Sequence, residues 1–152
     1  MIRFTRTDSE HPDFRLLAAE LEAELKIRDG DDHEALAQLN KIDFIPQALV
    51  IYENGNPIAC GAIREYEHGV MEIKRMYVKM NCRGKGIASM MLEQLENWAA
   101  ESSIKKCVLE TGRNQPEAIS LYLKKGYVQI PNFGAYTHSA NSVCFEKLLS
   151  LG

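Results

Sequence analysis

The chain has 152 residues and a mass of 17.2 kDa, a length that suits one domain, residues 1–152, around a single core. Hydrophobic residues make up 45% and charged residues 26%, which excludes a disordered or fibrous chain. The 18 basic and 21 acidic residues give a net charge of −3, which argues against a protein that binds nucleic acid mainly through positive charge.

Membrane, secretion and metal signals are missing from the sequence. No apolar run approaches the 18 or so residues of a membrane span, and the first residues lack a signal-peptide core. We therefore expect a cytoplasmic protein without membrane or nucleic-acid partners. The four cysteines are far apart, and none of the four histidines stands at metal-ligand spacing, so we expect reduced thiols that pack as small hydrophobes and no bound metal.

The first third of the chain predicts a strand and an amphipathic helix. Residues 2–5 fit a short strand, and apolar residues then recur at helical spacing from Phe14 to Leu25. A polar break over 28–34 follows, and a short second helix over 34–39 is expected before Pro46.

The middle of the chain predicts three consecutive antiparallel strands. Residues 48–52, 58–65 and 70–78 are rich in β-forming side chains, and turn residues over 54–57 and 68–69 separate them. The simplest arrangement is a meander.

The last third alternates helices and strands. An apolar stripe predicts a helix over 86–101, the strand-like residues 106–110 follow it, and a proline-started helix covers 116–125. Further strands are expected over 127–130 and 142–147. The order predicts an α+β fold with a mixed, mostly antiparallel central sheet of six to seven strands flanked by about four helices.

A glycine-rich turn, Arg83-Gly84-Lys85-Gly86-Ile87-Ala88, lies at the start of the 86–101 helix. Uncovered backbone N–H groups and the helix dipole make such a turn an anion site that suits phosphates. Its spacing matches neither the Walker loop nor the dinucleotide motif. Taken alone, the turn fits a tight turn with exposed charges equally well.

Two motifs in order resemble the GNAT superfamily of acyl-CoA-dependent N-acetyltransferases. The first is the R-G-x-G-x-A turn after a strand that ends Lys74-Arg75-Met76-Tyr77-Val78, and the second is Ala118-Ile119-x-Leu121-Tyr122-x-Lys124-x-Gly126-Tyr127. The similarity covers residues 48–127. It implies a GNAT-like fold and acetyl-CoA as the cofactor.

The resemblance also assigns coenzyme-binding residues. Backbone groups of the turn, Arg83, Gly84, Lys85, Gly86, Ile87 and Ala88, would wrap the coenzyme A pyrophosphate. The preceding strand would splay from its neighbour and offer main-chain groups around Met76, Tyr77 and Val78 to the pantetheine arm. Where the family often has a coenzyme-binding asparagine, this chain has Gln115, with Asn114 one residue earlier, and either could serve.

Two residues are candidates for the proton transfers that amide formation needs. Glu72 stands where many family members carry the base that accepts the amine's proton, and strand alternation offers the competing interpretation of a solvated side chain. Tyr122 matches the family tyrosine that protonates the coenzyme A sulfur, and the competing interpretation is a core aromatic residue.

Other features suggest an acceptor side. By resemblance, Phe133 and Tyr136 lie in a loop where the family varies its acceptor contacts, although both could simply anchor the loop. The acidic residues Asp29, Asp31, Asp32 and Glu34 could attract a cationic amine, but such a run is more often a solvated loop. Cys82 beside Arg83 has no local histidine base, which argues against nucleophilic catalysis there.

The resemblance implies an enzyme that moves an acetyl group from acetyl-CoA to a primary amine by direct attack in a ternary complex. The acceptor would be a small molecule or a peptide, and a homodimer is possible. One alternative is a catalytically silent acyl-CoA sensor, and another is a nucleotide- or phosphate-binding domain. Sequence alone does not select the acceptor.

Overall fold

A computed structural model describes residues 1–30 and 44–149 of the chain. These residues contain one seven-stranded sheet and three α-helices. The predicted helix over 34–39 lies outside the described residues, and so do Asp31, Asp32 and Glu34 of the acidic run. The α+β prediction is confirmed, with three helices described rather than about four.

The strand order is β1-β2-β3-β4-β5-β7-β6. The strands are β1 (Ile2–Thr7), β2 (Gln47–Glu53), β3 (Asn56–Glu67), β4 (Val70–Val78), β5 (Lys106–Gly112), β6 (Val128–Ile130) and β7 (Ser142–Leu148). All neighbours are antiparallel except β4 and β5, which are parallel. The predicted meander is thus β2-β3-β4, and the one parallel pair lies at the centre of the sheet.

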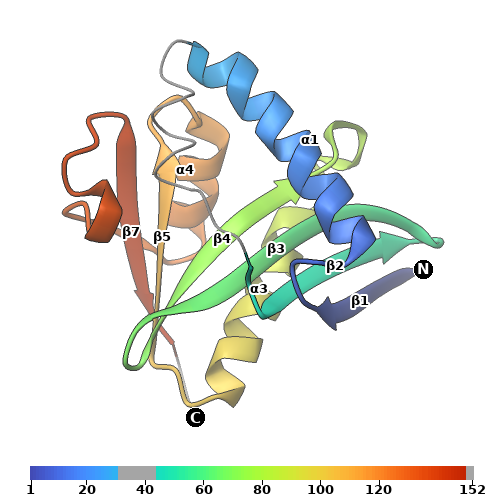
Figure 1. Ribbon diagram of the computed structural model, residues 1–152, viewed down its shortest axis with the longest axis horizontal. Helices are drawn as coiled ribbons and strands as arrows, with labels where there is room; N and C mark the ends of the chain where they lie inside the picture. Colours follow the sequence, from blue (N-terminus) through green and yellow to red (C-terminus); the bar gives the residue numbers. More distant parts are fainter. Residues whose placement is uncertain (31–43, 150–152) are drawn as a thin grey trace.

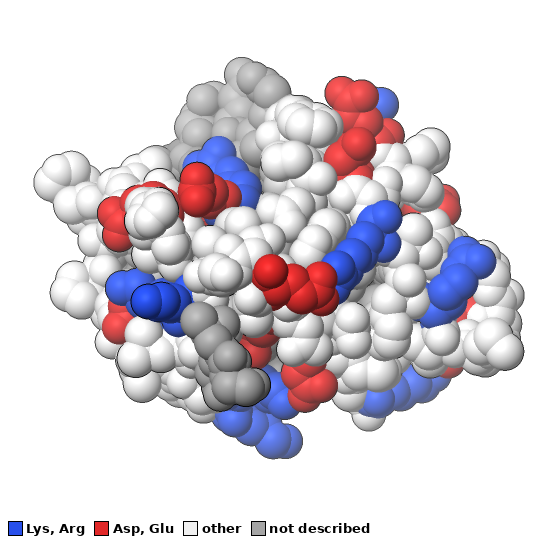
Figure 2. Space-filling model, turned by 90° about the horizontal axis from the view of Figure 1, so that it is seen from below, with Lys and Arg blue, Asp and Glu red and all other residues white. Residues whose placement is uncertain are grey.

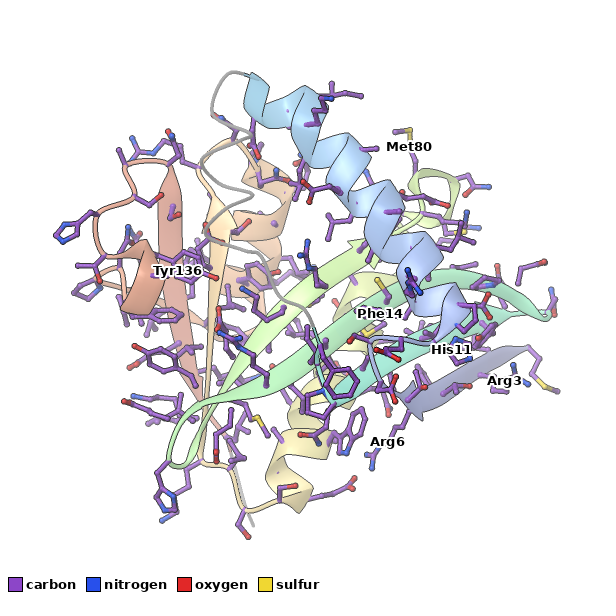
Figure 3. All side chains as sticks on the ribbon, in the orientation of Figure 1. Arg3, Arg6, His11, Phe14, Met80 and Tyr136 are labelled. Carbon is purple, nitrogen blue, oxygen red and sulfur yellow. The ribbon has the colours of Figure 1, made fainter. Side chains whose placement is uncertain are left out.

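The helices cover the two faces of the sheet unequally (Figure 1). Helix α1 (Pro12–Asp29) lies on one face, and α3 (Ile87–Glu101) and α4 (Pro116–Lys124) pack on the other. Phe14 and Leu17 of α1 are buried against the sheet, as Figure 3 shows for Phe14. The later apolar residues of the same stripe, Leu21 and Leu25, line a pocket instead, so the second half of α1 is left to form a site.

Helix α3 approaches the sheet closely over Gly61 of β3. A Cβ atom on that glycine would lie 2.8 Å from Leu95 Cδ1, closer than real Cβ contacts come, and 3.0 Å from Met91 Sδ, which is tighter than most of them. Because Gly61 has no side chain, the buried residues Met91 and Leu95 of α3 can pack directly against the strand. All four cysteines are free and buried, which confirms their prediction as packed thiols.

The charged surface is mixed in sign. On the face shown in Figure 2, basic and acidic side chains are interspersed rather than gathered into one basic area. None of the helices in the described part of the chain is long and apolar enough to cross a bilayer.

Candidate functional site

The two central parallel strands separate partway along their length. β4 pairs with β5 only from Val70 to Ile73, against Lys106 to Leu109, so the carboxyl-terminal half of β4 has no ladder on that side. A pocket of about 140 Å³ lies there, lined by residues of α1, β4, β5 and α4 and by Tyr136. The separation predicted for β4 is therefore present.

A bulge in β4 changes which face its side chains occupy. Ala62 of β3 pairs with Lys74 and Cys60 pairs with Tyr77, so β4 has one extra residue there, and Arg75 has a φ of 58°. A bulge reverses the strand's alternation. Before the bulge, Lys74 shares the α1 face with Glu72, and beyond it Met76 packs with the α3 and α4 core on the opposite face.

Glu72 lies in the pocket and is only 2% exposed. Its carboxylate accepts a hydrogen bond from the Tyr136 hydroxyl at 3.0 Å. Lys74 Nζ is 3.4 Å from Oε2, and Arg64 Nη2 is 3.7 Å from Oε1. The solvated interpretation of Glu72 is wrong, because the side chain is buried among two cations and a phenol.

Lys74 and Tyr136 form a buried pair beside this carboxylate. Lys74 Nζ donates to the Tyr136 oxygen at 2.6 Å, and both residues line the pocket. Burial lowers the pKa of Lys74, and the neighbouring Glu72 opposes that change. Burial also raises the pKa of Tyr136, as do the negative charges of Glu72 and Glu110. The phenol therefore stays protonated and can bridge the ammonium and the carboxylate.

Tyr122 reaches the same pocket from the opposite face of the sheet. It lies on α4, and its ring packs against Tyr127 and Phe145. Its hydroxyl lies 4.0 Å from Met76 Sδ, and the residue lines the pocket together with Glu72. Burial, with a smaller contribution from Glu110, raises the pKa of Tyr122. The residue is thus a core aromatic that also lines the pocket between the strands.

The structure separates Gln115 from Asn114. Asn114 is exposed, whereas Gln115 is 8% exposed and lines the pocket. Arg28 donates to the amide oxygen of Gln115 at 3.4 Å. Among the described residues, the amide nitrogen Nε2 of Gln115 has no hydrogen-bond partner. Of the two candidates, only Gln115 presents an unused donor at the pocket.

The glycine-rich turn leads into α3 with two left-handed glycines. Gly84 has a φ of 78° and Gly86, the N-cap, a φ of 81°, conformations that favour glycine. The first helical hydrogen bond runs from Met90 N–H to the Gly86 carbonyl, so the preceding helical N–H groups have no partner within the helix. This is the backbone arrangement of an anion site.

The side chain of Arg83 turns away from this backbone. It donates to the Val78 carbonyl at 2.8 Å and pairs with Glu24 of α1 at 2.8 Å. The turn keeps its backbone groups and the exposed Lys85 for a ligand. Arg83 instead ties the turn to the end of β4 and to α1.

Two further predicted residues lie away from the pocket lining. The hydroxyl of Tyr77 donates to Glu20 of α1 at 3.2 Å. Phe133 packs edge-on against Tyr66 and Tyr136, with ring centroids 5.0 and 5.5 Å away. Phe133 therefore supports Tyr136. Tyr136, which is labelled in Figure 3, lies in the short 3-10 helix η3 (Gly134–Tyr136).

Comparison with known proteins gives the family. The model of the acetyltransferase (GNAT) family matches residues 11–127. The chain belongs to this family. It is accordingly an enzyme of the N-acyltransferase class.

Individual members of the GNAT family resemble the chain to different degrees. The IAA acetyltransferase of Azospirillum brasilense is 37% identical over 102 residues, which are 66% of this chain and 67% of that protein. A Klebsiella pneumoniae protein assigned as an acyl-CoA N-acyltransferase is 31% identical, with a TM-score of 0.82 and 99% coverage of both chains. The PaiA N-acetyltransferase of Thermoplasma acidophilum, solved with coenzyme A, shares the fold at 20% identity and a TM-score of 0.66, covering 97% of this chain and 99% of that chain.

Several residues of this GNAT site were not predicted from the sequence. Lys74 and Arg64 lie beside the base candidate, and Glu110, which accepts a hydrogen bond from Ser142 at 2.6 Å, lines the same pocket. One signal was available for Lys74, because it stands two residues after Glu72 and so shares its face of the strand. In the described ranges, no three ligand-type side chains gather into a potential metal site.

Proposed function

We propose that the chain transfers an acetyl group from acetyl-CoA to an amine of a small molecule or peptide by direct attack, with Glu72 as the base and Tyr122 as the proton donor. One observation carries the proposal. Glu72 comes from the α1 face of the sheet and Tyr122 from the α4 face, and both line the pocket where β4 leaves β5. A base and an acid on either side of one gap suit a reaction that takes a proton from an amine and gives one to a leaving group.

The chain offers a matching set of groups for the coenzyme. The backbone of the glycine-rich turn suits the pyrophosphate, and the side of β4 that β5 leaves unpaired suits the amide groups of the pantetheine arm. The buried, unpartnered amide nitrogen of Gln115 supports a further hydrogen bond to a ligand oxygen. When bound, acetyl-CoA supplies the acetyl group as a thioester with a thiolate as leaving group.

Each candidate residue then has a defined task. Glu72 accepts the proton that the acceptor amine releases, either directly or through a water molecule. The Tyr122 hydroxyl donates a hydrogen bond toward the side of the gap where the sulfur of bound acetyl-CoA would lie. Because burial raises the pKa of Tyr122, the phenol stays protonated, and its hydrogen bond stabilises the negative charge that develops on the leaving group.

The first experiment measures coenzyme binding. A thermal-shift titration with acetyl-CoA is compared with ATP and NAD, since a ligand at 100 times its dissociation constant stabilises a protein by about 2.7 kcal/mol. We expect a shift with acetyl-CoA alone. A shift with ATP or NAD instead would favour a nucleotide-binding domain.

The second experiment measures transfer. Release of free thiol and the mass of the product are followed with a panel of amines, for the wild type, Glu72→Gln and the control Glu93→Gln. Glu93 forms an ion pair with Lys125 at the surface. We expect Glu72→Gln to lose on the order of 10²-fold in rate, with the acetyl-CoA shift retained and Glu93→Gln unaffected. Binding without turnover of any amine would favour the acyl-CoA sensor.

A further inference from the structure

A buried ammonium stands beside the base candidate, and the transfer described above does not use it. Lys74 is 6% exposed, and its Nζ lies 3.4 Å from Glu72 Oε2 and 2.6 Å from the Tyr136 oxygen. The Tyr136 hydroxyl donates to that same oxygen of Glu72 at 3.0 Å. One carboxylate oxygen therefore already faces both a cation and a hydrogen-bond donor.

Charged groups face this pair from every neighbouring element. Arg64 of β3 lies 3.7 Å from the other oxygen of Glu72, so this carboxylate forms ion pairs with two cations. Negative charge also reaches the pocket from β5 and α1. On α1, Glu22 forms an ion pair with Arg75 at 3.6 Å. On β5, Glu110 accepts the hydrogen bond from Ser142. The remaining carboxylate of the lining is Asp29 at the end of α1.

This arrangement treats the two protonation states of an incoming amine differently. An ammonium that approaches Glu72 meets a fixed ammonium on the same oxygen, and like charges at such distances repel strongly in a buried site. A neutral amine meets no such repulsion and has the lone pair that attack requires. Side-chain amines of the lysine type, with a pKa of about 10.4, are almost wholly protonated at pH 7, whereas α-amino groups, at about 7.7–8.0, are partly neutral.

We propose that Lys74 is a specificity-determining residue whose ammonium disfavours a second ammonium at Glu72, so that the acceptor is a weakly basic amine, such as an α-amino group beside a carbonyl, rather than an alkylamine. The inference rests on the proposed function and refines its acceptor. Tyr136 holds the ammonium in place from the loop before β7. The lowered pKa of Lys74 means that raising the pH removes the charge, and with it the discrimination.

The test uses two amines of nearly equal size and different basicity, ethylamine and 2,2-difluoroethylamine, with spermidine as a third probe. The fluorines withdraw electron density and make the nitrogen less basic. Because each pKa unit changes the neutral fraction about tenfold, we expect wild-type kcat/KM at pH 7 to favour difluoroethylamine by at least about tenfold. The preference should shrink as the pH rises toward 9.5. Equal or faster acetylation of ethylamine or spermidine at pH 7 would overturn the inference.

Variants assign the preference to the charge on Lys74. Lys74→Met keeps the length of the side chain without the charge and should reduce the preference at least about threefold, which no change in the amines' intrinsic reactivity would explain. Lys74→Arg should keep the preference. Lys106→Met is the matched control, because Lys106 pairs with Glu146 at the other end of β5. An unchanged preference in a folded Lys74→Met overturns the inference.

The outcomes separate this inference from the proposed function. If Lys74→Met fails to fold, Lys74→Gln, which also removes the charge, takes its place, because a rate that rises with pH reflects the neutral amine that any direct attack requires. A flat ethylamine profile overturns the inference. Acetyl-CoA binding without acetylation of these three amines or of any amine in the earlier panel contradicts the proposed function, and this inference with it. Turnover with no basicity preference removes this inference alone.

Discussion

At the scale of single residues, removal of the Tyr122 hydroxyl tests the role proposed for it at the leaving group. Tyr122→Phe keeps the ring contacts with Tyr127 and Phe145 and deletes only the oxygen that faces Met76. We expect kcat to fall on the order of 10²-fold with acetyl-CoA binding unchanged. Because burial raises the pKa of Tyr122, the wild-type rate should show no alkaline loss from this residue up to pH 9.

The control for this variant is another buried tyrosine whose hydroxyl lies outside the pocket. Tyr52 donates to Asp13 between β2 and α1, so Tyr52→Phe removes a phenol hydrogen bond without touching the site. Stopped-flow or steady-state rates of both variants, measured beside their melting temperatures, compare the two losses. Equal losses of rate in the two variants would show that the effect of Tyr122 is structural.

Gln115 is a residue where stability and binding should move in opposite directions. Its buried amide nitrogen has no partner among the described residues, and a buried unpaired donor costs about 1–3 kcal/mol. Gln115→Met replaces the amide with an apolar group of similar shape. We expect the free energy of unfolding, from urea denaturation, to stay level or rise by about 1 kcal/mol.

The same Gln115→Met variant should bind acetyl-CoA more weakly, as a smaller thermal shift at equal coenzyme concentration. A loss of stability together with unchanged coenzyme binding would mean that the amide serves the fold rather than the ligand. Asn114→Leu, one residue away and exposed, is the neighbouring control and should change neither quantity.

At the scale of elements, the bulge in β4 is held from the neighbouring strand. The buried thiol of Cys60 donates to the carbonyl of Arg75 at 3.3 Å, at the residue with the positive φ. Strand β3 therefore supports the distortion after Lys74 that turns Met76 to the α4 face, while Lys74 stays on the α1 face with Glu72. One local irregularity supplies side chains to both faces of the site.

The entry to α3 gives a matched pair of glycine substitutions. Gly86 and Gly55 have φ values of 81° and 85°, and neither would bring a Cβ within 4 Å of other atoms. An alanine at either position should cost about 1–2 kcal/mol of stability through backbone strain. Only Gly86→Ala, in the predicted phosphate turn, should also weaken acetyl-CoA binding. Equal thermal shifts with acetyl-CoA in both variants would argue against that turn as the phosphate site.

At the scale of the whole molecule, local sequence patterns predicted nearly all helices and strands but not the contacts that form the pocket. Apolar spacing located α3, and turn residues located the β2-β3-β4 meander, because these signals are local. The bulge at Arg75 was not predicted, since it depends on pairing with β3. Glu72 and Tyr122 were chosen by family resemblance, whereas the cations around Glu72 come together only through β3, β4 and the loop before β7.

Buried thiols and phenols should make the whole fold sensitive to alkali. Burial raises the pKa of Cys60 and Cys107 from 9.0 to about 12 and that of Cys144 to about 11. The folded state keeps these protons where the unfolded state loses them, so stability that is complete below pH 9 falls as the pH rises toward 12. Each thiol lowers the free energy of unfolding by up to about 1.4 kcal/mol per pH unit in that range. The lowered pKa of Lys74 acts in the opposite direction, but it is one group against three thiols.

Urea unfolding at pH 8, 9 and 10 measures this loss. We expect the midpoint to fall with pH while the slope with urea stays constant. Cys60→Ala removes one thiol, so its stability, although lower at pH 8, should fall less steeply. A midpoint that is level from pH 8 to 10 would contradict the assignment of buried, protonated thiols.

The short ladder between β4 and β5 has a consequence for amide exchange with solvent. In most sheets the central strands exchange slowest and the outer strands fastest, because hydrogen-bonded interior amides open only in larger unfolding events. Here pairing stops after Ile73 in the middle of the sheet. Deuterium should therefore enter β4 beyond the bulge as quickly as it enters an outer strand, and a ligand that occupies the gap should slow it. The molecule carries a sheet edge at its own centre.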